Sequence, residues 1–582
     1  MRRLLFVLAL AFAVPAFTPA LAEDRPLDRL VADYEAYALG QDPVTAGREG
    51  DRGALARLPD ASLAADLQRR AAYEAFQARL SAVDPAGLSP EARLNREFLA
   101  WTLDRRLKSL AFDEARMPFN SDSGFDIEMN YYASTTPLDS EADAEAWIAR
   151  LRALPGYYAQ NIENARRGVR TGFTQPATTG EAVLKRARAA AAAPVETDPL
   201  LKPFAAAKLP PARAAELRAA AEAVIRDRIR PAQRRFAEFL EREYLPASRK
   251  GLGARTLAGG EAYYRWLVAD HTTTAMTPDQ IHELGLAEVA RIRARMEEVK
   301  AEAGFQGDLS AFIRFLRTDP RFYARTREEL LEKTAWFDKR VDDQMPRWFG
   351  RLPRLPFGVR PVPAEIEEGY TSARYFEGAP KQGVAGGHIV NTSHLDQRPL
   401  FEMPALAAHE AQPGHHTQIA LAQELEGVPA FRRNAGVTAF TEGWGLYAER
   451  LAGEMGLYRN PYETFGMLSM EMWRACRLVA DTGIHWKGWT VAQAKTCFTD
   501  NTALAPLNID VELARYVGWP GQALAYKVGQ MKILELRERA RGRLGDRFDI
   551  RRFHDAVLLA GPLPLGLLEQ RIEAWTAAEA AR

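Results

Sequence analysis

The sequence predicts a mostly α-helical fold: a large helical body with a deep cleft and one small β element. Over most of the 582 residues, Leu, Ala and aromatic residues recur at three- and four-residue spacing between charges, which is a helical pattern. Helix-start signatures such as Ser89-Pro90-Glu91 and Thr277-Pro278-Asp279-Gln280 precede several of these stretches. Residues 370–394 combine β-branched residues with bounding glycines and are the best candidate for a β-hairpin.

The first 22 residues are typical of a secretory signal peptide. Arg2 and Arg3 form a positive region, an apolar stretch follows to Phe17, and Ala20-Leu21-Ala22 is a small-residue cleavage site. An uncleaved membrane anchor is disfavoured because the apolar stretch is shorter than the ~20 residues that span a bilayer. We therefore expect cleavage after Ala22 and a periplasmic or secreted protein with no membrane contact.

The remainder divides into an N-terminal helical region, 23–258, and a C-terminal helical region, 259–582, which we expect to form one continuous fold. Helical periodicity in the first region covers residues 27–110, 141–170 and 212–245. Residues 116–140 contain Pro, Asn, Ser and Gly, and we expect a loop there with Tyr131-Tyr132 available to line a surface.

In the second region, expected helices cover residues 260–271, 278–303, 309–317 and 326–344, and most of 402–582. The proline-rich segment 352–363 disfavours helix. It leads into the hairpin candidate, which precedes the segment with the highest density of chemically reactive residues.

Charge and cysteine content exclude some functions. Lys and Arg number 77 against 76 Asp and Glu, so no basic excess indicates a nucleic-acid partner. The two cysteines, Cys476 and Cys497, lack the spacing of a redox or zinc site. In an oxidising compartment they could form one disulfide, although spacing alone does not show that their Cα atoms approach closely.

The chemistry concentrates in one octapeptide. Five of the nine histidines fall within 29 residues, and three of them belong to the segment His409-Glu410-Ala411-Gln412-Pro413-Gly414-His415-His416. In a regular helix the ring of Pro413 would clash with the carbonyl of His409, so we expect a widened or bulged turn. With that turn looped out, the segment becomes His-Glu-x-x-His, which is typical of zinc peptidases.

Two histidines compete for the second ligand position. His416 lies nearly two turns after His409, on the same face of a straight helix but ~10 Å further along its axis. His415 can converge with His409 across the bulge, and the spacing favours it. Histidines packed near a helix kink, without a metal, remain an equal alternative from spacing alone.

A third ligand must come from another segment. Glu442 lies in a largely apolar stretch, and a buried carboxylate needs a cation or hydrogen bonds. Glu449, two turns later, could orient a ligating histidine from behind, or it could be an ordinary surface residue.

Three motifs occur in order along the chain: His-Glu-x-x-Pro-Gly-His from His409, Glu-Gly-Trp-x-Leu-Tyr-x-Glu from Glu442, and Arg-Tyr-x-x-Trp-Pro-Gly-Gln-Ala-x-x-Tyr-x-x-Gly from Arg515. With Gly-Gly-Glu-Ala-Tyr-Tyr near 259 and Val390-Asn391-Thr392, they make residues 25–578 resemble the bacterial domain-of-unknown-function family 885. That family is similar to helical zinc peptidases of the H-E-x-x-H plus Glu type. The resemblance implies one Zn²⁺ per chain on His409, His415 and Glu442, with Glu410 as general base.

Such a site also needs a donor for the oxyanion of the tetrahedral intermediate. The candidates are Tyr526, Tyr516, Arg515 and His388. We favour Tyr526 because it lies four residues after Gln522, so both could face one cleft from a helix. A buried tyrosine bonded to a backbone carbonyl is the competing interpretation.

We therefore predict a secreted zinc metallopeptidase that hydrolyses oligopeptides, as an oligopeptidase or a carboxypeptidase. A helical body of this size tends to enclose its site, which disfavours an endoprotease. The strand ending Ile389-Val390-Asn391 could hold an extended peptide by main-chain pairing. The alternatives are a zinc esterase or amidase and a non-catalytic periplasmic binding protein, but Glu410 has no purpose in a site that only binds.

Overall fold

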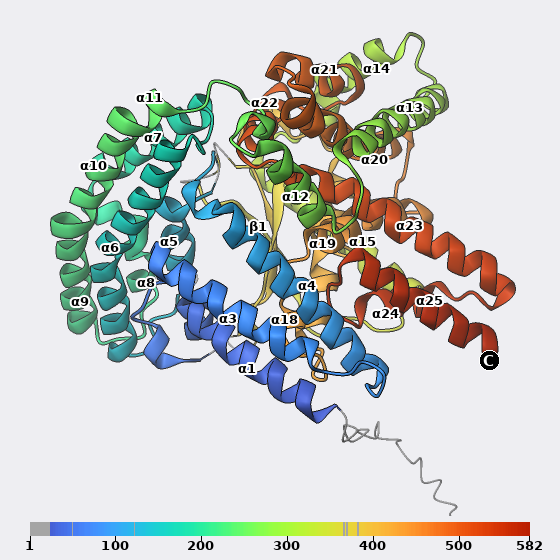
Figure 1. Ribbon diagram of the computed structural model, residues 1–582. Helices are drawn as coiled ribbons and strands as arrows, with labels where there is room; N and C mark the ends of the chain where they lie inside the picture. Colours follow the sequence, from blue (N-terminus) through green and yellow to red (C-terminus); the bar gives the residue numbers. More distant parts are fainter. Residues whose placement is uncertain are drawn as a thin grey trace, which may run out of the picture.

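The computed structural model describes residues 24–582 except 49, 122, 135, 365–366, 368–369 and 381–382. The predicted signal peptide lies outside the described residues. The described chain is mostly α-helical with one small three-stranded sheet, as the sequence predicts (Figure 1). Among the described helices, none combines the length and the apolar content that crossing a membrane requires.

The N-terminal part of the chain contains two groups of helices. The first group is α1 (Arg25–Gln41), α2 (Pro43–Arg48), α3 (Leu63–Ser81) and α4 (Pro90–Phe112). The second is α5 (Phe125–Ala133), α6 (Glu141–Thr171), α7 (Ala177–Ala192), α8 (Lys202–Ala205), α9 (Pro211–Val224), α10 (Arg230–Phe239) and α11 (Leu245–Ala247). In Figure 1 the second group, in teal and green, stands beside the rest of the molecule, and its buried residues form their own core cluster.

The helix expected over 212–245 is one run from α9 to α11, interrupted by wider turns at Ile225–Ile229 and Leu240–Tyr244. Each wide turn precedes a proline in the next helix, where a regular turn would place the proline ring against a carbonyl. The expected loop at 116–140 is partly wrong, because α5 lies within it. Phe125, Met129 and Ala133, spaced four apart, are buried and bind this short helix to its neighbours.

The C-terminal part is built from longer helices around the remaining core. They are α12 (Gly260–Thr272), α13 (Pro278–Glu302), α14 (Leu309–Thr318), α15 (Arg327–Trp348), α16 (Met403–Glu410), α17 (His415–Gln423), α18 (Ala430–Arg433), α19 (Thr438–Glu454), α20 (Pro461–Thr482), α21 (Val491–Asn501), α22 (Pro506–Gly518), α23 (Ala525–Leu544), α24 (Ile550–Leu558) and α25 (Leu565–Ala581). Thr277 forms the predicted capping box at the start of α13.

The hairpin candidate, residues 370–394, contains two strands, β2 (Ala373–Phe376) and β3 (Gly386–Val390), and a third strand, β1 (Phe357–Pro361), joins them in a mixed sheet. The strands lie in the order β1-β3-β2. β3 pairs in parallel with β1 and antiparallel with β2. Since both edges of β3 are occupied, the expectation that the strand ending Ile389-Val390 pairs with a peptide is wrong; the edge strand on that side is β2.

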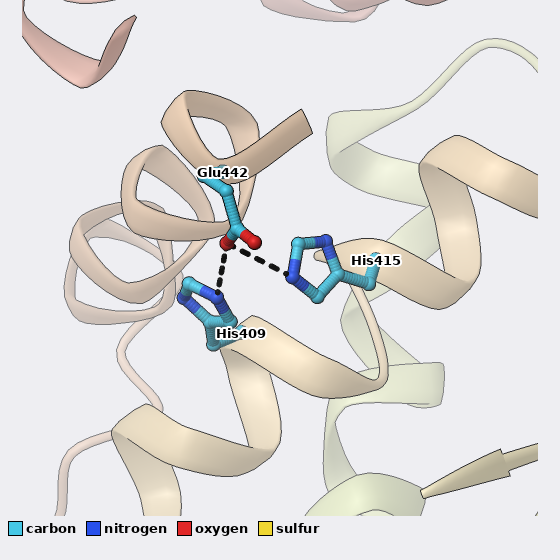
Figure 2. Close-up of side chains that lie close together, drawn as sticks. All are labelled: His409, His415 and Glu442. Carbon is cyan, nitrogen blue, oxygen red and sulfur yellow. Dashed lines mark ion pairs between the residues drawn. The ribbon is translucent and has the colours of Figure 1, made fainter. Parts of the chain in front are cut away.

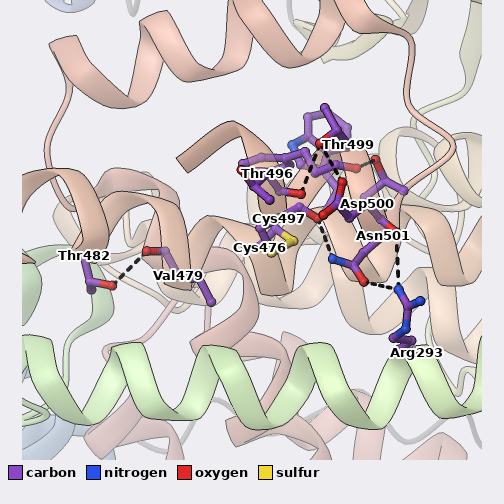
Figure 3. The surroundings of a disulfide bond; sticks show 12 residues. Arg293, Cys476, Val479, Thr482, Thr496, Cys497, Thr499, Asp500 and Asn501 are labelled. Atoms are coloured by element: carbon purple, nitrogen blue, oxygen red, sulfur yellow. Dashed lines mark hydrogen bonds between the residues drawn. A yellow bond between two sulfur atoms is a disulfide. The ribbon is translucent and has the colours of Figure 1, made fainter. Parts of the chain in front are cut away.

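A disulfide joins Cys476 of α20 to Cys497 of α21, with their Cα atoms 5.7 Å apart (Figure 3). Beside it, Arg293 of α13 donates a 2.7 Å hydrogen bond to the Asn501 side chain at the end of α21. The peripheral helix α21 is thus tied to α20 covalently and to α13 by a polar contact. The disulfide that the sequence left open is present.

Replacing both cysteines by alanine is expected to lower the free energy of unfolding by about 3 kcal/mol. The bond closes a loop with a sequence separation of 21 residues, and opening it restores conformational entropy to the unfolded chain. Denaturant unfolding of the double variant and of the reduced wild-type protein measures the change. Equal stability of oxidised and reduced protein would contradict it.

Candidate metal centre

The octapeptide forms a break between two helices rather than a bulge in one. α16 ends at Glu410 and α17 begins at His415, with a cis peptide bond between Gln412 and Pro413. A Cβ at Gly414 would come within 1.9 Å of the His409 carbonyl oxygen, so only glycine fits there. The predicted disruption is therefore present and larger than expected, and it lets the side chains on its two sides turn toward each other.

His409, His415 and Glu442 converge from α16, α17 and α19 (Figure 2). The Nε2 atoms of His409 and His415 both lie 3.4 Å from Oε2 of Glu442, and one potential ligand atom from each residue lies within 4.8 Å of the others. Both histidines are buried, whereas the Glu442 side chain is 21% exposed. Two imidazole nitrogens and one carboxylate oxygen, with solvent on one side, are the donor set of an open zinc site.

Glycines that the sequence analysis did not single out bring these helices together. A Cβ at Gly445 would lie 2.7 Å from the His409 ring, so α19 can approach α16 only because residue 445 has no side chain. Gly443 faces Gly529 of α23, and a Cβ on either would meet the opposite backbone at less than 3 Å. In the sequence, the alternation of Gly443 and Gly445 with Glu442 and Trp444 was the available signal of a close helix contact.

Glu449 lies behind His409, in the orienting role that the sequence allowed. Its Oε1 is 2.8 Å from Nδ1 of His409, and it also pairs with Arg474 at 3.2 Å. Arg474 belongs to α20 and was not foreseen from the sequence. Because the carboxylate engages Nδ1, Nε2 is the imidazole nitrogen that faces Glu442 and a metal.

The cluster favours positive charge. Burial disfavours the imidazolium form of His409, but the carboxylates of Glu442 and Glu449 outweigh it and raise its pKa to about 9. Burial alone would raise the pKa of Glu442, yet hydrogen bonds from His409 and His415 hold it well below its usual range. The imidazoles and carboxylates of the cluster therefore stabilise one another's charged forms in this buried position.

His416 points away from the cluster. Its Nδ1 lies 3.1 Å from the Tyr375 hydroxyl, and its ring packs on Phe357 with centroids 4.6 Å apart. Its side chain is buried against the sheet, and burial lowers its pKa to about 4. The preference for His415 over His416 agrees with this geometry.

Glu410 is held by the edge of the sheet. Its Oε2 accepts a 2.7 Å hydrogen bond from the backbone N–H of Tyr375 in β2. In the antiparallel ladder of β2 and β3, hydrogen-bonded pairs alternate with non-bonded pairs. The Asn391 N–H bonds to Ser372, and the Tyr375–His388 pair lies three positions along the ladder, so it is a non-bonded pair and the Tyr375 N–H points away from β3. The sheet thereby fixes a carboxylate adjacent in sequence to His409.

Of the predicted oxyanion donors, Tyr526 fits best. Its side chain is partly exposed, and burial, with a smaller contribution from the charge of Glu442, raises its pKa. The hydroxyl of Tyr516 is buried and already accepts bonds from Trp473 and Arg477. His388 is also fully buried, 3.0 Å from Asp338.

The fourth candidate, Arg515, donates to Gln522 and Glu512. Gln522 is thus engaged by an arginine rather than turned freely to a cleft. Tyr526 follows it on α23, a helix that α19 meets at the Gly443–Gly529 contact. This packing places the helix of Tyr526 against the helix of Glu442, a relation that spacing on one helix could not reveal.

Comparisons with known proteins place this chain among bacterial proteins without an assigned activity. A crystal structure described as a putative lipoprotein from Colwellia psychrerythraea matches with a TM-score of 0.90 and 28% identity, over 96% of this chain and 99% of that one. A putative lipoprotein of unknown function from Shewanella oneidensis shares the fold, with a TM-score of 0.72 and 19% identity over 95% and 99% of the two chains. A comparison with curated sequences finds no match.

The family described as "Bacterial protein of unknown function (DUF885)" matches residues 43–572, which include every helix and strand that forms the cluster. The resemblance seen in the three sequence motifs is thereby confirmed. This chain is a member of the DUF885 family.

Proposed function

We propose that this protein is an extracytoplasmic zinc-dependent hydrolase that cleaves peptide bonds of oligopeptides. The observation that carries the proposal is the convergence of His409, His415 and Glu442 beside Glu410. The donor set suits zinc, which when bound there would polarise a water molecule and the scissile carbonyl. The location is supported by the disulfide and by the description of similar proteins as putative lipoproteins.

Glu410 is the proposed general base. It is largely buried, adjacent in sequence to a ligand, and oriented by the Tyr375 amide. In hydrolysis its carboxylate takes a proton from the attacking water and delivers that proton to the leaving nitrogen. A site that only bound a ligand would have no use for this residue.

Tyr526 is the proposed oxyanion donor, through its hydroxyl. The outer edge of β2 is the proposed place for the main chain of an extended substrate, since the bond from the Tyr375 amide to Glu410 sets this edge beside the proposed general base. Together these groups would bind the carbonyl, orient the chain and transfer the proton.

Glu410→Gln is expected to lower kcat at least about 10³-fold while zinc stays bound, because the amide cannot accept the proton of water. Hydrolysis of a mixed peptide library by the zinc-loaded proteins, with zinc content measured by elemental analysis, provides the test. Wild-type protein that carries zinc but cleaves only esters or non-peptide amides would replace the peptidase proposal. Metal-bound protein without any Glu410-dependent turnover would exclude hydrolysis.

His415→Gln is expected to lower zinc affinity by at least about 10²-fold, since one of three protein ligands is lost. His416→Gln is the matched control, because the neighbouring buried imidazole faces Tyr375 and should leave zinc binding unchanged. Competition with a chelator of known affinity measures both. Equal zinc affinity in wild type and His415→Gln would overturn the ligand assignment.

Tyr526→Phe is expected to reduce kcat by about 10- to 10³-fold with little change in KM or zinc content, since only the transition-state contact is removed. Steady-state kinetics on one cleaved peptide separates the two constants. A rise in KM at constant kcat would assign Tyr526 to ground-state binding instead.

A further inference from the structure

Two arginines, one on α20 and one on α22, lie near Tyr526 and the turn before it. The guanidinium carbon of Arg477 is 4.1 Å from the centroid of the Tyr526 ring. Arg515 bonds at 2.7 Å to Gln522, one turn before Tyr526. Neither arginine has a role in the hydrolysis described above.

The two guanidinium groups share a single carboxylate. Arg477 and Arg515 each donate a 3.0 Å hydrogen bond to the same oxygen, Oε2 of Glu512. Glu512 is 5% exposed and Arg477 is 3% exposed, so the cluster holds a net positive charge away from water. Asp481, another buried acid of α20, is engaged by Tyr264 and the Gly521 amide, and burial raises its pKa to about 7.

A donor in this cluster has no acceptor. Nη1 of Arg477 is buried, and no hydrogen-bond partner for it exists among the residues that the structure describes. Arg432 and Arg537 also keep one buried nitrogen without a partner, their Nε, but each has a carboxylate of its own, Glu91 and Glu454 respectively. Arg477 differs because it shares its carboxylate with a second arginine. Leaving a charged donor unpaired in a buried position is costly unless an anion takes it at some stage.

Part of the cluster and of the candidate metal site meets solvent. The Arg515 side chain is 11% exposed, and Tyr526 and Glu442 are also partly exposed. Tyr526 links the arginines to the candidate metal site. Arg477 lies over its ring, and one turn later on the same helix Gly529 packs against Gly443, the residue after Glu442. An anion bound by the arginines would therefore lie next to the bond that the proposed zinc site attacks.

We propose that Arg477 and Arg515 form a subsite for a substrate carboxylate, so that the enzyme selects peptides carrying a carboxylate close to the scissile bond. This inference rests on the proposed hydrolase function and names its substrate class. Guanidinium groups are the side chains best suited to a carboxylate, because their N–H groups match its two oxygens. The carboxylate is either the C-terminus of the peptide or an acidic side chain.

The test compares N-acetylated hexapeptide libraries with a free or an amidated C-terminus, each made with and without Glu. Zinc-loaded wild type is expected to show a kcat/KM for carboxylate-bearing peptides at least on the order of 10- to 10²-fold above that for peptides without one. A preference for the free acid identifies the C-terminus as the group bound. A preference for Glu within the amides identifies the side chain.

Arg515→Gln should abolish that preference while leaving turnover of the neutral amides and zinc content unchanged. In this variant Glu512 keeps Arg477, so no buried acid is left alone. Arg432→Gln, a buried arginine on α18, is the matched control and should keep the wild-type preference. A wild-type enzyme that does not distinguish the libraries, or a preference that survives in Arg515→Gln, overturns the proposal even if a variant folds poorly.

Failure of the proposed function gives a different result. If no library is cleaved in a Glu410-dependent way, binding of acetyl-pentaalanine and its amide to the zinc-loaded Glu410→Gln protein is measured by calorimetry. Tighter binding of the acid than the amide, lost on adding Arg515→Gln, supports the subsite without hydrolysis. Equal binding of the two overturns it.

Discussion

The site depends on how closely α19 approaches its neighbours. Glu442 can meet His409 because Gly445, one turn later, leaves room for the imidazole ring. On another face, Gly443 against Gly529 lets the backbone of α19 touch that of α23. Interiors are packed without spare space, so one methyl group at these positions would separate the ligands from one another or from Tyr526. The close approach of α19 to α16 and α23 thus depends on three glycines, Gly443, Gly445 and Gly529.

A second constraint acts through charge. Buried acids and bases are stable only when they are paired, and around this site the pairing forms a continuous chain. Glu442 meets both histidines, His409 meets Glu449, and Glu449 meets Arg474. One turn after Arg474 on the same helix, Arg477 donates a hydrogen bond to Glu512. The polar interior of α20 therefore supports the metal cluster and the arginine cluster from one element.

Local signals were sufficient to predict much of this. Helix starts at Ser89 and Thr277 follow from capping rules that involve only four residues. The octapeptide predicted a disrupted helix and a pairing of His409 with His415, because a proline four residues after His409 conflicts with regular hydrogen bonding. The order of β1-β3-β2 could not be predicted, since the pairing of strands separated by loops depends on tertiary packing. Arg515 was a candidate from the sequence, but its pairing with Arg477 on Glu512 was missed because Arg477 lies far from both in sequence and resembles an ordinary helix-surface charge.

The N-terminal region also contributes to the architecture of the site. Gln175, between α6 and α7, donates hydrogen bonds to the carbonyls of Phe119 and Gly518, and Ser121 contacts the carbonyl of Ala514. These bonds hold the end of α22, which carries Arg515, against a loop from the first quarter of the chain. A fragment beginning at residue 259 would keep every proposed ligand but lose the contacts that hold the end of α22 in place. The candidate site and the N-terminal helices therefore have to be expressed and engineered together.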